Sequence, residues 1–396
     1  MEELRVLELY SGIGGMHYAI KDSGIPFQVV AAIDINTIAN QIYQHNFPDT
    51  PLWNKTIEGI TLDDFNKLSF DMILMSPPCQ PFTRLGHQGD IADPRTKSFL
   101  YILDILPRLC KRPRLILLEN VKGFESSSAR ERLVKTLKEC GYTYQEIMIS
   151  PPSVGIPNSR LRYYLIAKIS TETFSAETRS KILEAFPHAA ETDSPVFPYP
   201  TETIPPEQHA VSSLSTPDTC QPEEDMQGGH FLYKLETMIE VQRKMNQNND
   251  LSVRQIRDFL EPQTEDKVEK FLLPPKTLLR YAQILDIVQP TCRRSVCFTK
   301  GYGRYVEGTG SVLQSCMETE MASIFRGLDQ CSEDEKLQQL FKLKLRYFTP
   351  REVANLMGFP QSFSFPEQIS TKQQYRVLGN SLNVVVVARL LQLMIS

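Results

Sequence analysis

The stretch RVLELYSGIGGMHYAIKDSG, residues 5–24, decides the fold class. It opens with a short apolar run typical of a buried strand, and it ends with a segment typical of a helix closed by Gly24. Gly12, Gly14 and Gly15 lie between the two. Glycines in that place permit a tight turn and let a ligand approach the backbone N–H groups at the helix start. The stretch therefore predicts a strand, a ligand-binding turn and a helix.

The glycine turn differs from a dinucleotide-binding motif. His17 stands where the third glycine of G-x-G-x-x-G belongs, which disfavours an NAD-dependent dehydrogenase. Asp34 ends the next apolar run, and a carboxylate there can accept hydrogen bonds from a ribose. Glu58, after the following loop, could serve the same ligand. Taken alone, this pattern fits an adenosine-type cofactor and a purely structural turn with a capping acid equally well.

Strand and helix signals alternate through the first 170 residues. Continuous apolar strands separated by helices predict a mostly parallel α/β sheet covered on both faces. We expect Asn36 to cap one of the helices. The expected strands are 5–10, 27–35, 70–76, 114–120, 143–150 and 160–169, and the expected helices are 16–24, 36–46, 97–109 and 127–141.

Composition changes after this region. Residues 182–233 contain no Lys or Arg but nine acids and eight prolines, too little apolar content for a core. Helical patterns return at 231–245, 252–260, 274–288 and 333–345, and the last segment is apolar at helical spacing. We expect a first domain at 1–180, an irregular acidic insertion at 181–230, a smaller second domain at 231–340, and a return to the first domain at 341–396.

Charge and cysteine content limit the class of protein. The net charge is −4, yet outside the acidic insertion 43 basic residues face 38 acids, a net of +5 that permits a polyanion-binding face. Solvated surface charge is the plainer interpretation of any single basic cluster.

No apolar run reaches about 18 residues, so we expect no membrane span. The N-terminus lacks a signal-peptide pattern, and eight scattered cysteines without a CxxC pair predict reduced thiols and no metal site.

The segment SPPCQPFT, residues 76–83, places one cysteine in a loop stiffened by three prolines. Cys79 follows an apolar strand, and strand ends of an open α/β sheet face the ligand crevice. A nucleophilic cysteine needs this access and fixed direction. A buried, unreactive cysteine in a turn is the usual alternative.

Further polar residues follow other strands. Glu119 ends the strand at 114–120 and is a candidate acid for a ring nitrogen. Arg160 and Arg162 occupy alternate positions of an expected strand, so both should face one side and suit a phosphate or a base carbonyl.

This ordered set resembles the cytosine-5 methyltransferase family. LELYSGIGG resembles its cofactor turn, AAIDIN its ribose acid, SPPCQPFT its nucleophile loop and LENVKGF its glutamate motif. GIPNSRLRYYLIA resembles its arginine motif, and YRVLGNSLNVVVVARL its C-terminal motif. The absence of a large N-terminal region and the sequence Cys297-Phe298-Thr299 resemble the tRNA-aspartate branch, formerly classed with DNA methyltransferases. The resemblance covers the chain apart from residues 182–233.

The resemblance implies a Rossmann-like class I methyltransferase with a small target-recognition domain. It implies S-adenosylmethionine as cofactor, S-adenosylhomocysteine as product, and methylation of an anticodon-loop cytosine, position 38 of tRNA-aspartate. Cys79 would attack C6 of the base, Glu119 would hydrogen-bond the ring, and Arg162, with Arg160 nearby, would support the intermediate. The expected cofactor-binding residues are Ser11, Gly12, Ile13, Gly14, Gly15, Asp34, Ile35, Ile57, Glu58, Ser76, Pro78, Asn380 and Ser381. The expected RNA-binding residues are Arg84, Lys122, Arg293, Arg294 and Lys300.

We expect a monomer of the cytoplasm or also the nucleus, with tRNA as partner, DNA as a weak partner at most, and no metal. Two other functions stay open at this point. A DNA cytosine-5 methyltransferase would use the same chemistry, and a catalytically silent module would only bind cofactor or nucleic acid. The presence of Cys79, Glu119 and Arg162 together argues against the silent module.

Overall fold

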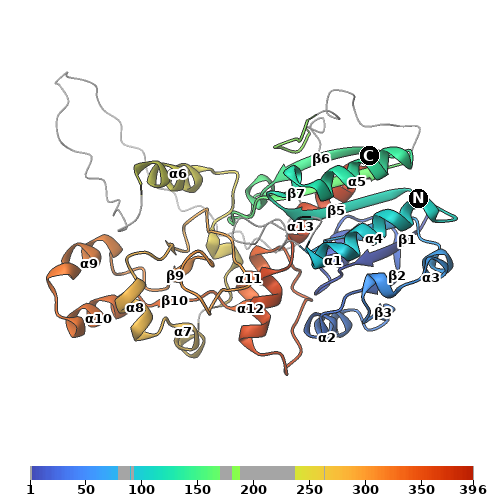
Figure 1. Cartoon of the computed structure of the whole chain (residues 1–396). Coiled ribbons are helices and arrows are strands. Elements are labelled where there is room, and N and C mark those ends of the chain that lie inside the picture. Colours follow the sequence, from blue (N-terminus) through green and yellow to red (C-terminus); the bar gives the residue numbers. More distant parts are fainter. Residues whose placement is uncertain are drawn as a thin grey trace, which may run out of the picture.

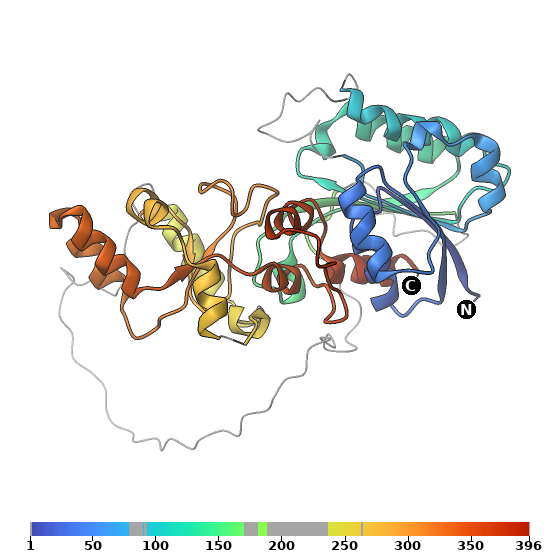
Figure 2. The ribbon, with the colours of Figure 1, turned by 90° about the horizontal axis from the view of Figure 1, so that it is seen from below.

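The computed structural model describes residues 2–78, 90, 93–169, 181–187, 237–262 and 264–395. The described chain forms two lobes side by side, and helices α11 (Pro350–Leu356) and α12 (Thr371–Gly379) lie between them (Figures 1 and 2). Cys79, Arg84 and most of the acidic insertion lie outside the described residues.

The first lobe is built on a seven-stranded sheet in the order β3-β2-β1-β4-β5-β7-β6. Strands β1 to β5 pair in parallel, and β7 is antiparallel to both of its neighbours. This is the mostly parallel, Rossmann-like arrangement that the sequence predicted. The strands are β1 (Leu4–Leu9), β2 (Phe27–Ile33), β3 (Leu52–Trp53), β4 (Met72–Met75), β5 (Leu115–Val121), β6 (Thr143–Ile149) and β7 (Arg162–Lys168).

Both faces of this sheet are buried, which explains its continuous apolar strands. Along β1, Val6 belongs to one hydrophobic cluster and Leu7 to the other, because successive side chains point to opposite faces. The first cluster is shared with helices α1 (Gly15–Asp22), α2 (Thr37–Asn46) and α13 (Val384–Ile395), and the second with α3 (Leu62–Leu68), α4 (Lys97–Ile105) and α5 (Ser128–Glu139).

One local expectation of the first lobe is confirmed here and two are corrected. The Asn36 side chain caps α2 by accepting from the N–H groups of Ile38 and Ala39. Strand β7 begins only at Arg162, so Arg160 precedes the strand instead of occupying an alternate position within it. Residues 181–187, assigned from sequence to the irregular insertion, partly extend the sheet edge, because Leu183 exchanges backbone hydrogen bonds with Glu146 and Met148.

The second lobe has a three-stranded sheet in the order β10-β9-β8. The helix expected at 252–260 is only a 3₁₀ turn over Ile256–Phe259, because the Ile256 and Arg257 N–H groups donate to the carbonyls of Cys292 and Pro290 on a neighbouring loop. The elements of this lobe are α6 (Met238–Asn249), α7 (Glu265–Phe271), α8 (Pro275–Tyr281), β8 (Ile287–Val288), β9 (Val312–Gln314), α9 (Met321–Gly327), α10 (Glu333–Lys342) and β10 (Leu345–Arg346).

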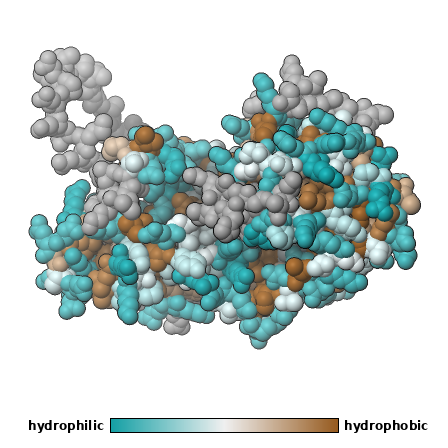
Figure 3. Space-filling model, in the orientation of Figure 1, coloured by the Kyte–Doolittle hydropathy of each residue, from teal (hydrophilic) through white to brown (hydrophobic). Residues whose placement is uncertain are grey.

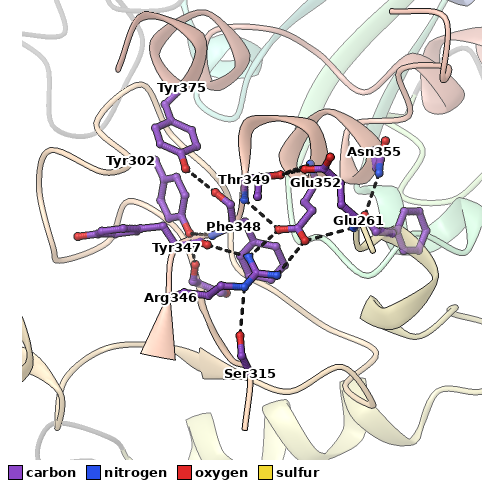
Figure 4. A network of polar contacts seen from close by, with 12 residues as sticks. Glu261, Tyr302, Ser315, Arg346, Tyr347, Phe348, Thr349, Glu352, Asn355 and Tyr375 are labelled. Carbon is purple, nitrogen blue, oxygen red and sulfur yellow. Dashed lines mark hydrogen bonds and ion pairs between the residues drawn. The ribbon is translucent and has the colours of Figure 1, made fainter. Parts of the chain in front are cut away.

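A buried ion pair joins the second lobe to the helices between the lobes. Arg346 at the end of β10 donates through Nη1 and Nη2 to the two carboxylate oxygens of Glu352 on α11, each at 2.8 Å (Figure 4). Glu352 also accepts from the Thr349 N–H at 2.9 Å and from the Glu261 N–H at 3.2 Å. Because the charges are paired bidentately and further bonded, this network fixes how the second lobe meets α11.

The C-terminal segment, apolar at helical spacing in the sequence, forms two helices. Helix α12 ends at Gly379, and α13 starts at Val384 and packs against α1 and β7. Among the described residues, Thr371–Ile395 is the stretch long and apolar enough to cross a membrane by length and composition. Its apolar residues, such as Leu378 and Leu390, lie in the core of the first lobe, which accounts for its composition.

Candidate active site

A cavity of about 550 Å³ lies at the carboxyl edge of the large sheet. Its walls come from the segments that follow β1, β2, β4 and the end of β5, and from the loop between α12 and α13. Crevices at this edge are where open α/β sheets bind ligands. Residues widely separated in sequence therefore meet here.

The glycine turn forms one wall, but one of its glycines has a different role. Ser11, Gly12, Ile13 and Gly15 line the cavity. Gly14, expected to bind the cofactor, does not line it. Its φ of +87° and the Phe47 ring, 2.5 Å from where a Cβ would stand, require glycine at this position for backbone shape and packing.

Asp34 stabilises the glycine turn as well as facing the cavity. Its Oδ2 accepts from the Gly12 N–H at 2.9 Å, and its Oδ1 accepts from the Asn36 N–H at 2.7 Å. Burial raises the pKa of the Asp34 carboxyl, and these backbone hydrogen bonds partly oppose the shift. The expected neighbours Ile35, Ile57 and Glu58 also line the cavity.

The other expected cofactor residues also reach the cavity. Ser76 and Pro78 line it from the end of β4, and Asn380 and Ser381 from the loop after α12. The Ser76 hydroxyl donates to the Tyr10 carbonyl at 3.2 Å, which ties two strand ends together.

Glu119 lies in the cavity wall together with the arginines. Its side chain is buried, and its Oε1 is 3.5 Å from the Arg162 Nε. Burial raises the pKa of the Glu119 carboxyl, and Arg162 and Arg160 only partly oppose that effect. A carboxyl group with a raised pKa beside two guanidinium groups can hold or release a proton within the cavity.

Arg160 connects three segments of the chain. It is only 4% exposed, and its guanidinium donates to the carbonyls of Phe298 and Gly379, both at 3.3 Å, and to the carbonyl of Ser381. It also contacts the Cys297 Sγ at 3.4 Å. Because these groups occupy its Nη atoms, Arg160 holds the cavity wall together, whereas Arg162 lies beside Glu119.

Cys297, the first residue of Cys297-Phe298-Thr299, lies against both arginines. Burial would raise the pKa of its thiol, but Arg160 and Arg162 outweigh burial and lower it. Among the described residues, no group of three or more His, Cys, Asp and Glu side chains could hold a metal ion.

Sequence reasoning missed several lining residues. Tyr10 takes a φ of +58°, uncommon for a residue other than glycine, and its hydroxyl donates to the Ser98 hydroxyl at 2.9 Å. The only sequence signal for Tyr10 was its place directly before the glycine turn. The other missed residues include Lys55, Thr56, Arg95, Ser98, Val377 and Leu382.

The expected RNA-binding residues divide into two groups. Lys122 and Lys300 are exposed. Arg293 is half-buried and donates to the Val253 carbonyl. Arg294 is 6% exposed and pairs with Asp286 at 2.6 Å, so its side chain is held within the second lobe.

Comparison with known proteins gives the family. The profile of the C-5 cytosine-specific DNA methylase family matches residues 4–396. A human tRNA (cytosine(38)-C(5))-methyltransferase is 57% identical over 395 residues, covering all of both chains. A Dictyostelium discoideum DNA (cytosine-5)-methyltransferase is 38% identical over 400 residues, covering all of this chain and 95% of the other. The crystal structure of a Spodoptera frugiperda DNMT2 mutant has a TM-score of 0.76 and 38% identity, with both chains fully covered. The chain therefore belongs to the family of C-5 cytosine-specific methylases.

Proposed function

We propose that this protein is a tRNA cytosine-5 methyltransferase that acts on the cytosine at position 38 of the anticodon loop. The observation that carries the proposal is a single cavity in which the glycine turn and Asp34 lie together with Glu119 and Arg162. The chain is also similar over its whole length to the human tRNA (cytosine(38)-C(5))-methyltransferase. The proposed substrate is tRNA-aspartate, as the resemblance of the sequence implies.

S-adenosylmethionine is the proposed cofactor, and the first-lobe wall of the cavity fits it. Asp34 and Glu58 offer carboxylate oxygens to ribose hydroxyls. The buried Ser11 Oγ has no hydrogen-bond partner among the described residues, so it is available to a polar group of the cofactor. When bound, S-adenosylmethionine supplies an electrophilic methyl group. The residues that would hold it are Ser11, Gly12, Ile13, Gly15, Asp34, Ile35, Ile57, Glu58, Ser76, Pro78, Asn380 and Ser381.

The base would be activated by a covalent bond to Cys79. The loop that carries Cys79 continues directly from Pro77 and Pro78, which line the cavity. Attack of the thiolate on C6 of cytosine gives C5 the electron density to take the methyl group. Loss of the C5 proton to a base then lets the C6–S bond break, which restores the ring and the free thiolate.

Glu119 and Arg162 would act on the edge of the same base. The raised pKa of Glu119 favours a protonated carboxyl that can donate to the ring N3 as C6 is attacked. Arg162, held 3.5 Å from Glu119, can donate to the base carbonyl. Arg160 would act as a positioning residue that holds the cavity wall in place, because its Nη atoms are hydrogen-bonded to protein carbonyls.

The competing function is methylation of DNA, for which the Dictyostelium relative is named. The direct test offers labelled S-adenosylmethionine with tRNA and with duplex DNA of matched cytosine content, at the same salt concentration. We expect transfer to tRNA to be far faster, because a loop base costs less to expose than a paired and stacked one. Equal or faster transfer to duplex DNA would reject the tRNA assignment.

A further inference from the structure

We propose that Tyr305 and Arg304 form a stacking platform for an unpaired base next to the target cytosine in the RNA loop. The inference rests on the proposed function, because it extends the same site to a neighbouring nucleotide. Tyr305 is 57% exposed, and the Arg304 guanidinium carbon lies 5.0 Å from the centre of its ring. Tyrosine rings and arginine planes are the surfaces on which proteins stack single-stranded bases.

Several hydrogen bonds hold the loop that carries this pair. The Thr299 N–H donates to the Thr309 carbonyl at 2.9 Å, and the Thr309 hydroxyl donates to the Tyr305 carbonyl at 2.8 Å. Tyr302 anchors the loop from below, with its hydroxyl donating to the Ser311 carbonyl at 2.7 Å and accepting from the Phe348 N–H at 2.9 Å. Because the loop is already held in place, a ligand that binds its exposed aromatic side chain loses little affinity to ordering of the loop.

Close packing places this loop against a segment that lines the cavity. Gly379 lines the cavity, and a Cβ on Gly379 would lie 2.2 Å from the Lys300 nitrogen. The Tyr305 ring packs over Gly301, the residue after Lys300, because a Cβ on Gly301 would lie 3.0 Å from Tyr305 Cδ2. Tyr305 is therefore linked to the cavity wall through two close contacts, one with Gly301 and one between Lys300 and Gly379.

The chemistry of the loop fits a nucleic acid and not an apolar partner. Lys300 and Arg304 are exposed cations, and Glu307 is an exposed acid in the same loop. Figure 3 shows hydrophobic residues scattered among hydrophilic ones over both lobes, on the face that it presents. When a target base enters the cavity, its unstacked neighbour remains at the rim, where Tyr305 can replace the lost stacking partner.

The test compares the binding of an anticodon stem-loop RNA by the full chain, with S-adenosylhomocysteine present and salt fixed. Tyr305→Ala should weaken binding about fivefold or more, the equivalent of about 1 kcal/mol for one lost base stack. Tyr305→Phe should stay within about twofold of wild type, because the ring is kept. The matched control is Phe341→Ala, which removes an aromatic side chain of 45% exposure from α10, at the outer end of the second lobe (Figure 1).

Abasic RNAs identify the partner base. Removing the stacked base should weaken wild type but not Tyr305→Ala, so the two changes should be non-additive at one loop position. Equal affinity of Tyr305→Ala and wild type, an equal loss in Tyr305→Phe, or additivity at every loop position would overturn the inference. If wild type methylates tRNA normally in these cases, only the platform is rejected. Failure of wild type to methylate tRNA would reject the proposed function and the platform together.

Discussion

The backbone of Thr299 packs directly against Gly379. A Cβ on Gly379 would lie 2.2 Å from the Thr299 carbonyl carbon and 2.5 Å from its oxygen. Arg160 spans the same junction by donating to the carbonyls of Phe298 and Gly379. Since Gly379 and Arg160 both line the cavity, two parts of its wall pack against a loop of the second lobe.

Gly379→Ala should disrupt this junction. The added methyl group meets backbone, which cannot rotate away, so we expect a loss of about 1–3 kcal/mol in the free energy of unfolding. S-adenosylmethionine should also bind more weakly, because Asn380 and Ser381 would move with the wall. Urea unfolding and cofactor titration measure the two effects. Gly327→Ala is the control, because a Cβ there meets nothing within 4 Å. If Gly379→Ala matched this control in both measurements, the junction would have no part in shaping the cavity.

Glu119→Gln should remove one limb of the pH–rate profile. Burial raises the pKa of Glu119, so its protonated form persists to higher pH than that of an ordinary glutamate. If the protonated carboxyl is the acid, the wild-type rate should fall as pH rises through this raised pKa. Glutamine cannot transfer the proton, and we expect a loss of about 10²–10⁴-fold in kcat with that limb absent. The exposed Glu139→Gln is the control. A Glu119→Gln variant that keeps the wild-type profile would rule Glu119 out as the acid.

Asp286→Asn should destabilise the second lobe. Burial alone would raise the pKa of Asp286, but Arg294, Lys244 and Ser311 outweigh it and lower the pKa to about 2. A lowered pKa stabilises the fold above the unfolded value near 4, and this stability is lost as pH falls through about 2. Asparagine removes the negative charge with which Lys244 and the buried Arg294 pair, and we expect a loss of about 3 kcal/mol in the free energy of unfolding at pH 7. Urea unfolding of both proteins should show the difference shrinking between pH 4 and pH 2. A constant difference over that range would contradict the assigned pairing.

Cys79→Ala should abolish methyl transfer without changing cofactor affinity, because the thiolate acts only on the base. RNA containing 5-fluorocytidine at the target should form a stable adduct with wild type, since fluorine at C5 cannot leave as a proton does. Denaturing gel electrophoresis with S-adenosylmethionine present detects that adduct. Cys110→Ala, which removes an exposed thiol, should form it normally. Turnover by Cys79→Ala would exclude the covalent route.

The sequence predicted the large sheet and most of the cavity because both depend on local pattern. Apolar runs fix the strands, and parallel strand ends bring Ser11, Asp34 and Glu119 to one edge. Burial of charged residues does not show in such a pattern. The sequence predicted Arg294 as an RNA contact and gave no sign of its pairing with Asp286. The two residues are eight positions apart, a spacing that does not indicate a contact.

Close backbone contacts were equally hidden. The sequence assigned Gly14 the same cofactor-binding role as its neighbours in the glycine turn. The structure shows that the Phe47 ring fills the space beside Gly14. The link between Arg160 and the carbonyl of Gly379 joins residues 219 positions apart. Such contacts between distant segments depend on the packing of the lobes, which periodicity does not encode.

Methylation of a matched pair of tRNAs tests the central claim most directly. One is tRNA-aspartate with cytosine at position 38, and the other carries uridine there and is otherwise identical. Labelled S-adenosylmethionine and mass analysis of the isolated anticodon loop give both the amount and the position of the methyl group. The account predicts close to one methyl group per tRNA at cytosine 38, as the name of the human relative implies for that protein, and none on the uridine variant. Equal labelling of the two tRNAs, or labelling at another position, would contradict it.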